Sequence, residues 1–161
     1  MNHKSRAQIS FPLDIPSVAV LEERMTRGGD CIITVESTPT STVYRICGRE
    51  ITQFRSHDEW IQLRHLPILG HRVYIRLRPK RYECPYCSKK TTTQQLDWYG
   101  ANSPHTKAYD DHLMLQLVGS TVEDVRRKED VGYDASILCA SAGLRALAPA
   151  ARPARRPTAR R

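Results

Sequence analysis

The sequence predicts an α+β protein in which a small β-rich module is followed by a short helical module and a low-complexity tail. Apolar and polar residues alternate over 73–77, which is the period of a half-buried strand. After Ser103 the apolar spacing becomes helical, and after Ala140 the composition changes to Ala, Arg and Pro. We therefore expect a disordered leader (1–12), a β module (13–95), a helical module (103–138) and a disordered tail (140–161).

Two β-runs joined by a glycine turn open the β module. The run 17–20 precedes the turn at 27–30, and the apolar run 31–35 follows it, so this segment predicts a hairpin. The clearest strand is 73–77, which places three apolar side chains on one face and mostly basic side chains on the other. This strand leads the chain into a Cys-x-x-Cys turn at 84–87.

Three short helices are expected in the helical module. The Ser-Pro pair at 103–104 is a typical helix start, because Ser caps free N–H groups and Pro is favoured at the first helical position. Ser120 has capping-box spacing with Glu123, which predicts a second helix over 121–130. A third helix that begins at 135 would complete a helix-turn-helix.

Positive charge is concentrated in two blocks. Residues 44–90 contain 11 Lys and Arg but only 4 Asp and Glu, and residues 145–161 contain 6 Arg and no acidic residue. Residues 91–144 contain 4 basic and 8 acidic residues. This distribution is typical of a protein that binds a polyanion.

The basic residues of the strand and of the second helix are the candidate DNA contacts, because Arg and Lys bind the phosphate backbone. These candidates are Arg72, Arg76, Arg78, Lys80, Arg81, Arg126, Arg127 and Lys128. For the strand, the alternative is a solvated charged face. For the helices, the alternative is a small acidic bundle, because the segment 91–144 is net negative.

The cysteines form one complete and one incomplete zinc knuckle. A structural zinc site takes four ligands, usually two from each of two tight turns with Cys-x-x-Cys spacing. Cys84 and Cys87 supply one such turn, but Cys47 has Tyr44 instead of a cysteine three residues earlier. We expect Cys47, Cys84 and Cys87 to bind zinc with a substitute fourth ligand. The candidates for it are His57, His65, Cys31 and water. The alternative is that these thiols no longer hold a metal and are ordinary half-buried residues.

The cysteines, the strand and the helices occur in an order that resembles one known family. The matching stretches are Cys47-Gly48, Leu66 to Gly70, Val73 to Leu77, Lys80 to Cys87 and Ser120 to Val125. Over about residues 13–138 the chain resembles the zinc finger and helix-turn-helix region of the bacterial insertion-sequence transposases of the ISL-three group. The resemblance implies a zinc-ribbon-like β module, in which Tyr44 takes the place of the first zinc cysteine.

The resemblance also implies a function and partners. It suggests a DNA-binding N-terminal transposase fragment that recognises the terminal inverted repeats of the transposon in double-stranded DNA. The family continues into a catalytic domain with an Asp-Asp-Glu triad that binds two metal ions, and this chain ends before it, so we expect no catalytic residues. The tail has the composition of out-of-frame translation, which predicts a truncated copy. The alternative function is a zinc-ribbon protein-interaction module that modulates full-length transposase.

Two observations bear on the compartment. No apolar run approaches the roughly 18 residues that a membrane span needs, and the N-terminus lacks the apolar stretch of a signal peptide. Five cysteines, an odd number with two in a Cys-x-x-Cys, favour metal binding in a reducing compartment over a disulfide framework. We therefore expect a cytoplasmic protein without a membrane partner.

Overall fold

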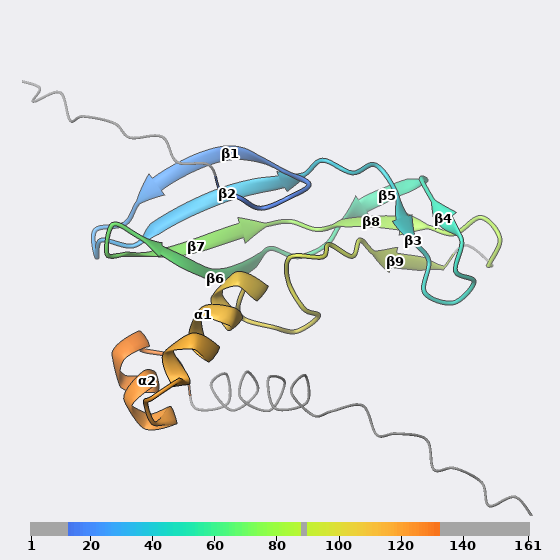
Figure 1. Ribbon diagram of the computed structural model, residues 1–161. Coiled ribbons are helices and arrows are strands. Elements are labelled where there is room, and N and C mark those ends of the chain that lie inside the picture. The colour runs from blue at the N-terminus through green and yellow to red at the C-terminus, as the bar shows by residue number, and fades with distance from the viewer. Residues whose placement is uncertain (1–12, 88–89, 133–161) are drawn as a thin grey trace, which may run out of the picture. The chain divides into compact units, whose positions relative to one another are not determined.

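The computed structural model describes residues 13–87 and 90–132 (Figure 1). This part of the chain is mostly β-sheet with two short helices, which confirms the predicted α+β class. The chain divides into two compact units at the boundary between Lys107 and Ala108. The predicted leader, the third helix from 135 and the tail 140–161 lie outside the described residues.

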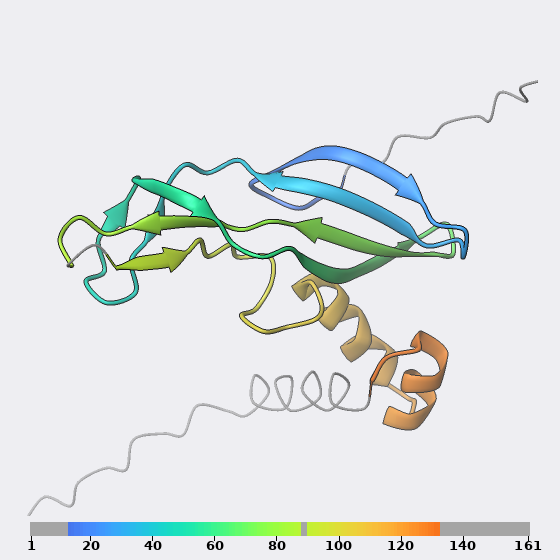
Figure 2. The same cartoon turned by 180° about the vertical axis from the view of Figure 1, so that it is seen from behind.

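The strands of the described residues form three sheets (Figure 2). The first sheet has the order β1-β2-β7-β6, with β1 at Val18–Met25, β2 at Cys31–Ser37, β7 at His71–Leu77 and β6 at Ile61–Ile68. The second pairs β3 (Thr42–Val43) with β4 (Glu50–Ile51). The third has the order β5-β8-β9, with β5 at Phe54–His57, β8 at Lys80–Glu83 and β9 at Thr91–Thr93.

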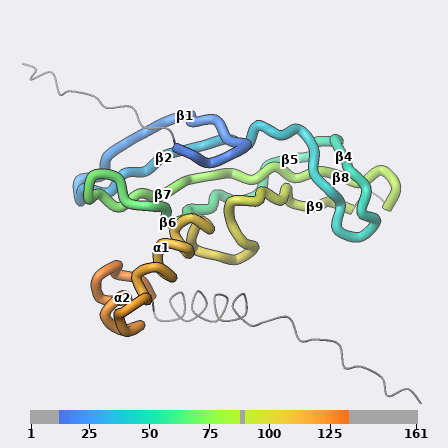
Figure 3. The backbone as a smooth tube through the Cα atoms, in the orientation of Figure 1, coloured from blue at the N-terminus to red at the C-terminus, as the bar shows by residue number. Residues whose placement is uncertain are grey.

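The large sheet consists of two hairpins joined by one parallel pairing. β1 and β2 pair antiparallel, as predicted, and so do β6 and β7. β2 and β7 pair parallel, with Cys31 opposite Val73 and Val35 opposite Leu77. Parallel strands cannot be joined by a tight turn, so the chain must leave the sheet after β2 and return before β7. Figure 3 shows this path, and β3, β4 and β5 lie on the excursion.

The core of the β-rich unit lies on one face of the large sheet. Val73, Ile75 and Leu77 are all fully buried, which confirms the alternating strand predicted over 73–77. They pack with Leu96 and Trp98 from the segment after β9, which covers this face of the sheet. The polar residues between them in β7 therefore belong to the opposite face.

The first helix, α1 (Lys107–Leu117), begins later than the sequence predicted. The Ser103 hydroxyl accepts a hydrogen bond from the His105 N–H, but it closes a local turn and caps no helix. The N–H of Thr106 donates to the carbonyl of Arg64 at 2.9 Å, so residues 104–106 bind the edge of β6. The prediction of a helix start at Ser103 was wrong, because this bridge competes with helix formation.

The second helix, α2 (Val122–Glu129), agrees with the predicted segment, but its cap differs. The N-cap is Thr121, not Ser120, and its hydroxyl accepts a hydrogen bond from the Asp124 N–H at 3.1 Å. Val125 packs with Tyr109 and Leu113 of α1 in a small separate core. Neither described helix is long and apolar enough to cross a membrane.

Replacement of a core leucine should destabilise the β-rich unit much more than replacement of an exposed one. Leu63 is 3% exposed on β6, whereas Leu21 is 60% exposed at the β1 bulge. Leu63→Ala should lower the free energy of unfolding by about 2–5 kcal/mol, because it leaves a cavity. Leu21→Ala should change it by less than about 0.5 kcal/mol. Chemical denaturation followed by tryptophan fluorescence measures both, and equal effects would contradict this location of the core.

Candidate functional site

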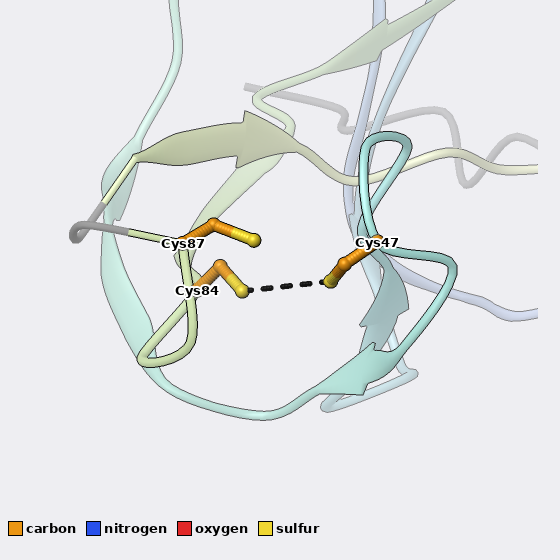
Figure 4. Close-up of side chains that lie close together, drawn as sticks. All are labelled: Cys47, Cys84 and Cys87. Atoms are coloured by element: carbon orange, nitrogen blue, oxygen red, sulfur yellow. Dashed lines mark hydrogen bonds between the residues drawn. The ribbon is translucent and has the colours of Figure 1, made fainter.

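Two turns from distant parts of the sequence bring three cysteines together (Figure 4). Cys47 lies in the turn between β3 and β4, and Cys84 and Cys87 lie in the turn between β8 and β9. The three sulfur atoms all lie within 4.8 Å of one another, and the Sγ atoms of Cys47 and Cys84 are 3.8 Å apart. The sequence-predicted cysteines therefore form one cluster.

The two turns have matching backbone hydrogen bonds. In the first, the Tyr44 N–H donates to the Arg49 carbonyl at 2.8 Å. In the second, the Cys84 N–H donates to the Lys90 carbonyl at 3.0 Å. Gly48 closes the first turn with φ +66°, a conformation that glycine adopts without strain. Tyr44 thus occupies in the first turn the position that Cys84 occupies in the second.

The side chain of Tyr44 is buried beside the thiols. It is 1% exposed and belongs to one apolar cluster with Ile51, Tyr82 and Cys84, against which Cys47 and Cys87 pack. Burial, and then the neighbouring thiols, raise the pKa of the Tyr44 phenol. A four-ligand zinc site would have its fourth ligand at position 44. In this chain that position, the fourth corner of the site, has an aromatic ring instead of a thiol.

The candidate fourth ligands from the sequence lie elsewhere. His65 is buried in the large sheet, and its Nδ1 is 2.9 Å from the Thr106 hydroxyl. His57 lies on β5 opposite Lys80, with its ring against Phe54. Cys31 begins β2 and packs against the core of the large sheet. Within residues 13–87 and 90–132, the metal-ligating side chains that gather in one place are the three thiols alone.

The donor set fits a thiophilic metal ion with three protein ligands. Thiolate is the ligand that such ions prefer, and the sulfur spacing allows all three to bind one ion. A closed four-cysteine zinc site would need a thiol at position 44, where the chain has tyrosine. The cluster is therefore compatible with metal binding but differs from a complete zinc knuckle pair.

The thiols differ in acidity. A hydrogen bond from the backbone N–H of Arg49 lowers the pKa of Cys47, and contacts with the neighbouring thiols lower it further. Burial, followed by the neighbouring thiols, raises the pKa of Cys87 to about 11. Cys47 is therefore the thiol that ionises before Cys87 as the pH rises.

One aromatic ring, that of Trp60, lies beside two arginines, Arg76 and Arg78. The guanidinium group of Arg76 lies 4.5 Å from the centre of the Trp60 ring, and that of Arg78 lies 6.0 Å from it. Arg78 also donates to the Asp58 carbonyl at 3.0 Å. Arg72 is exposed on β7, the strand that also carries Arg76. Trp60 was not among the predicted site residues, because the sequence does not give the pairing register of β6 and β7.

Lys80 and Arg81 are held by contacts within the protein. The Lys80 ammonium group donates to the Ser37 carbonyl at 2.7 Å and lies 3.5 Å from the Glu36 carboxylate. Arg81 donates to the Thr91 hydroxyl at 3.0 Å, while its buried Nε has no hydrogen-bond partner in the structure. The ammonium group of Lys80 is therefore used in contacts within the protein. The guanidinium group of Arg81 has one N–H group, at Nε, without a hydrogen-bond acceptor.

Arg81 also lines a polar groove of about 540 Å³ beside residues 91–97. Arg45 and Lys107 line the same groove, and Asp97 contributes an acidic side chain. Neither Arg45 nor Lys107 was predicted from the sequence as a site residue. The signal was too weak, because the two residues are 62 positions apart in the chain and belong to no common motif.

The basic residues of α2 form local pairs. Arg126 lies 3.2 Å from Glu123, and Arg127 lies 2.7 Å from Asp124. Lys128 donates to the Gln116 side chain at 2.7 Å. These contacts are exposed and of the kind that contributes little to stability, so all three side chains can exchange them for other partners.

The pKa difference predicts an order of alkylation in the reduced, metal-free protein. At pH 8 iodoacetamide should modify Cys47 before Cys87, because only the thiolate reacts and a lowered pKa gives more thiolate. The rate at Cys47 should stop rising with pH at a lower pH than the rate at Cys87. Peptide mass spectrometry after timed quenching measures both. Faster modification of Cys87 would show that the Arg49 hydrogen bond does not control the site.

Comparison with known proteins identifies the segment that contains the cluster. Residues 46–87 match the family of zinc-fingers of the transposases IS204/IS1001/IS1096/IS1165. No curated protein and no solved structure matches the chain. The match runs from just before Cys47 to Cys87 and so includes all three clustered thiols. Over residues 46–87 the resemblance seen in the sequence is confirmed: this segment is similar to the zinc-finger of the ISL-three group of transposases.

Proposed function

We propose that the chain is a DNA-binding region of an insertion-sequence transposase that recognises the terminal inverted repeats of its element in the cytoplasm. The transposase zinc-finger match carries this proposal. The segment that matches lies within the block 44–90, where basic residues outnumber acidic ones by 11 to 4. A positive field of this kind attracts the phosphate backbone of duplex DNA.

The outer face of the large sheet is the first proposed contact. Arg76 and Arg78 lie beside the Trp60 ring, which restricts their side chains before any ligand binds. A guanidinium group stacked on a ring can still use its edge donors for phosphate oxygens. The restricted arginines therefore lose less conformational entropy on binding than free ones.

The groove beside residues 91–97 is the second proposed contact. It places Arg45, Arg81 and Lys107 around one polar space with a single acidic lining residue, Asp97. Three cations against one carboxylate give the groove a net positive charge, which favours an anionic ligand there. Phosphate contacts of this kind position the protein without reading sequence.

Sequence preference for transposon ends would come from the helical unit. The helices α1 and α2 are joined by a short turn with Gly119 at φ +80°, as in a helix-turn-helix. Arg126, Arg127 and Lys128 would exchange their local partners for phosphates. The helix that would enter the groove begins at 135 in our prediction and lies outside the described residues.

We propose binding, not strand transfer, as the role of the described part. In these residues, His, Cys, Asp and Glu side chains gather into a possible metal site at the three thiols alone. A two-metal transposase centre uses carboxylates to hold its ions. The thiol cluster offers none, so it supports a structural role for a metal.

One observation favours the alternative of a protein-interaction module. β1 is an edge strand of the large sheet and exposes Val20, Leu21 and Met25. An exposed apolar edge can pair with a strand of another chain, such as full-length transposase. The charge distribution favours DNA over this alternative, because protein partners do not require a concentrated positive block.

Loss of the restricted arginines should weaken DNA binding. Arg76→Ala/Arg78→Ala should reduce the slope of log affinity against log salt by about 2, since each phosphate contact contributes about 0.9. Arg27→Ala is the control, because Arg27 is exposed in the β1–β2 turn at the far end of the sheet. Fluorescence anisotropy with an inverted-repeat duplex and a shuffled duplex, each at two salt concentrations, measures the effect.

The same titration separates the two proposed functions. An unchanged salt slope in the double variant, with its circular dichroism intact, would remove the sheet face from the DNA contact. Equal affinity for inverted-repeat and shuffled DNA would remove end recognition but keep general DNA binding. No binding to either duplex by the wild type, together with capture of full-length transposase, would establish the interaction module.

A further inference from the structure

The fourth corner of the thiol cluster distinguishes this site from a zinc site with four cysteines. Tyr44 and Cys84 occupy equivalent positions, since each donates its backbone N–H to the residue just before the next strand. A cysteine at position 44 would therefore face the other three sulfurs. In this chain the position holds a ring that is 1% exposed and packs against Cys84, Ile51 and Tyr82.

The ring also leaves a zinc ion without a fourth thiolate ligand. Zinc in a structural site is four-coordinate and tetrahedral, and a three-thiolate site needs water or another donor to complete it. Cys84 is fully buried beside Tyr44 and Tyr82, whereas Cys47 and Cys87 are partly exposed, so the fourth donor for zinc would have to come from solvent. A phenol hydroxyl is a hard oxygen donor and binds soft ions much less well than thiolate does. In residues 13–87 and 90–132, three thiols are thus the whole donor set.

We propose that Cys47, Cys84 and Cys87 form a three-coordinate thiolate site that binds thiophilic ions of trigonal-pyramidal geometry, of which trivalent arsenic is the probe, in preference to zinc. Such an ion takes three sulfurs and directs a lone pair toward the fourth corner, so it needs no fourth ligand. The sulfur atoms, all within 4.8 Å of one another, can reach one ion together. This site does not depend on whether the chain binds DNA.

The binding step is a ligand exchange without oxidation or reduction. Arsenous acid, As(OH)₃, reacts with the three thiols to give one arsenic bonded to three sulfurs and three molecules of water. Each S–H bond that breaks supplies the proton that leaves with a hydroxide as water. Three As–O bonds are replaced by three As–S bonds, and arsenic stays in the trivalent state.

The proposal predicts how many thiols one ion protects. With full-length protein kept reduced by a phosphine, one equivalent of arsenite should leave two of the five cysteines open to alkylation. In Cys87→Ser one of the three donors is missing, so arsenite should no longer protect three thiols at once from alkylation. Cys31→Ser is the matched control, since Cys31 lies outside the cluster, and should bind arsenite as the wild type does.

Two substitutions at position 44 test the preference between ions. Tyr44→Cys should tighten zinc binding by at least roughly 100-fold, because even a partner that only orients a ligand changes metal affinity by 10–100-fold. Tyr44→Phe keeps the ring and removes the hydroxyl, so it should leave the affinities for arsenite and zinc unchanged. Competition titrations with a zinc indicator and thiol counting give both affinities.

Three outcomes would overturn the proposal. Protection of only two thiols would show ordinary capture by the Cys84 and Cys87 pair. Equal zinc affinity in the wild type and Tyr44→Cys would show that position 44 is not the fourth corner. A loss of metal binding in Tyr44→Phe would make the phenol oxygen a ligand. If Cys87→Ser does not fold, the thiol count of the wild type still decides between three donors and two.

Discussion

The parallel pairing of β2 with β7 is the constraint on which the rest of the β-rich unit depends. Two hairpins could form from local contacts alone, but the parallel register requires the chain to leave the sheet between them. The excursion carries the turn that contains Cys47. After β7 the chain continues into β8, which pairs with β5 of this excursion. β8 is followed by the turn that contains Cys84 and Cys87. One strand pairing thus brings together thiols that are 37 residues apart.

Elements with a local cause could be predicted from the sequence. The first hairpin follows from its glycine turn, and the strand 73–77 follows from its alternation. The helix start at Ser103 could not, because the backbone of 104–106 pairs with Arg64, a partner about 40 residues away. The thiol cluster followed from turn spacing, but the burial of Tyr44 within it depends on contacts with Ile51 and Tyr82. The contact between Trp60 and Arg76 likewise could not be predicted, because it depends on how β6 and β7 pair in the sheet.

The basic side chains of the described residues differ in the groups that they contact. Arg76 and Arg78 lie against one aromatic ring, and Arg81 shares a groove with Arg45 and Lys107. In contrast, the charges of α2 are paired one turn apart with acidic residues. Cations held by a ring keep their attraction for phosphate, whereas ion-paired ones must first give up a partner. Among the described residues, the arginines beside Trp60 are therefore better placed to attract a phosphate than the ion-paired arginines of α2.

The knuckle region must gain its stability from something other than a four-cysteine zinc site. A structural zinc contributes about 10–16 kcal/mol in small fingers, whereas a fully buried aromatic side chain contributes about 1.5–3 kcal/mol. The Tyr44 ring alone thus replaces only a fraction of the metal. Hydrogen bonds of Gln94 are a second source of stability. Its side chain accepts a hydrogen bond from the Ser37 hydroxyl at 2.6 Å and donates to the carbonyls of Pro39 and Ser41. These bonds join the segment after β9 to the end of β2 and to the chain that leads to the first knuckle. Because the two turns are held by the large sheet in this way, the thiols can remain clustered while the fourth ligand is absent.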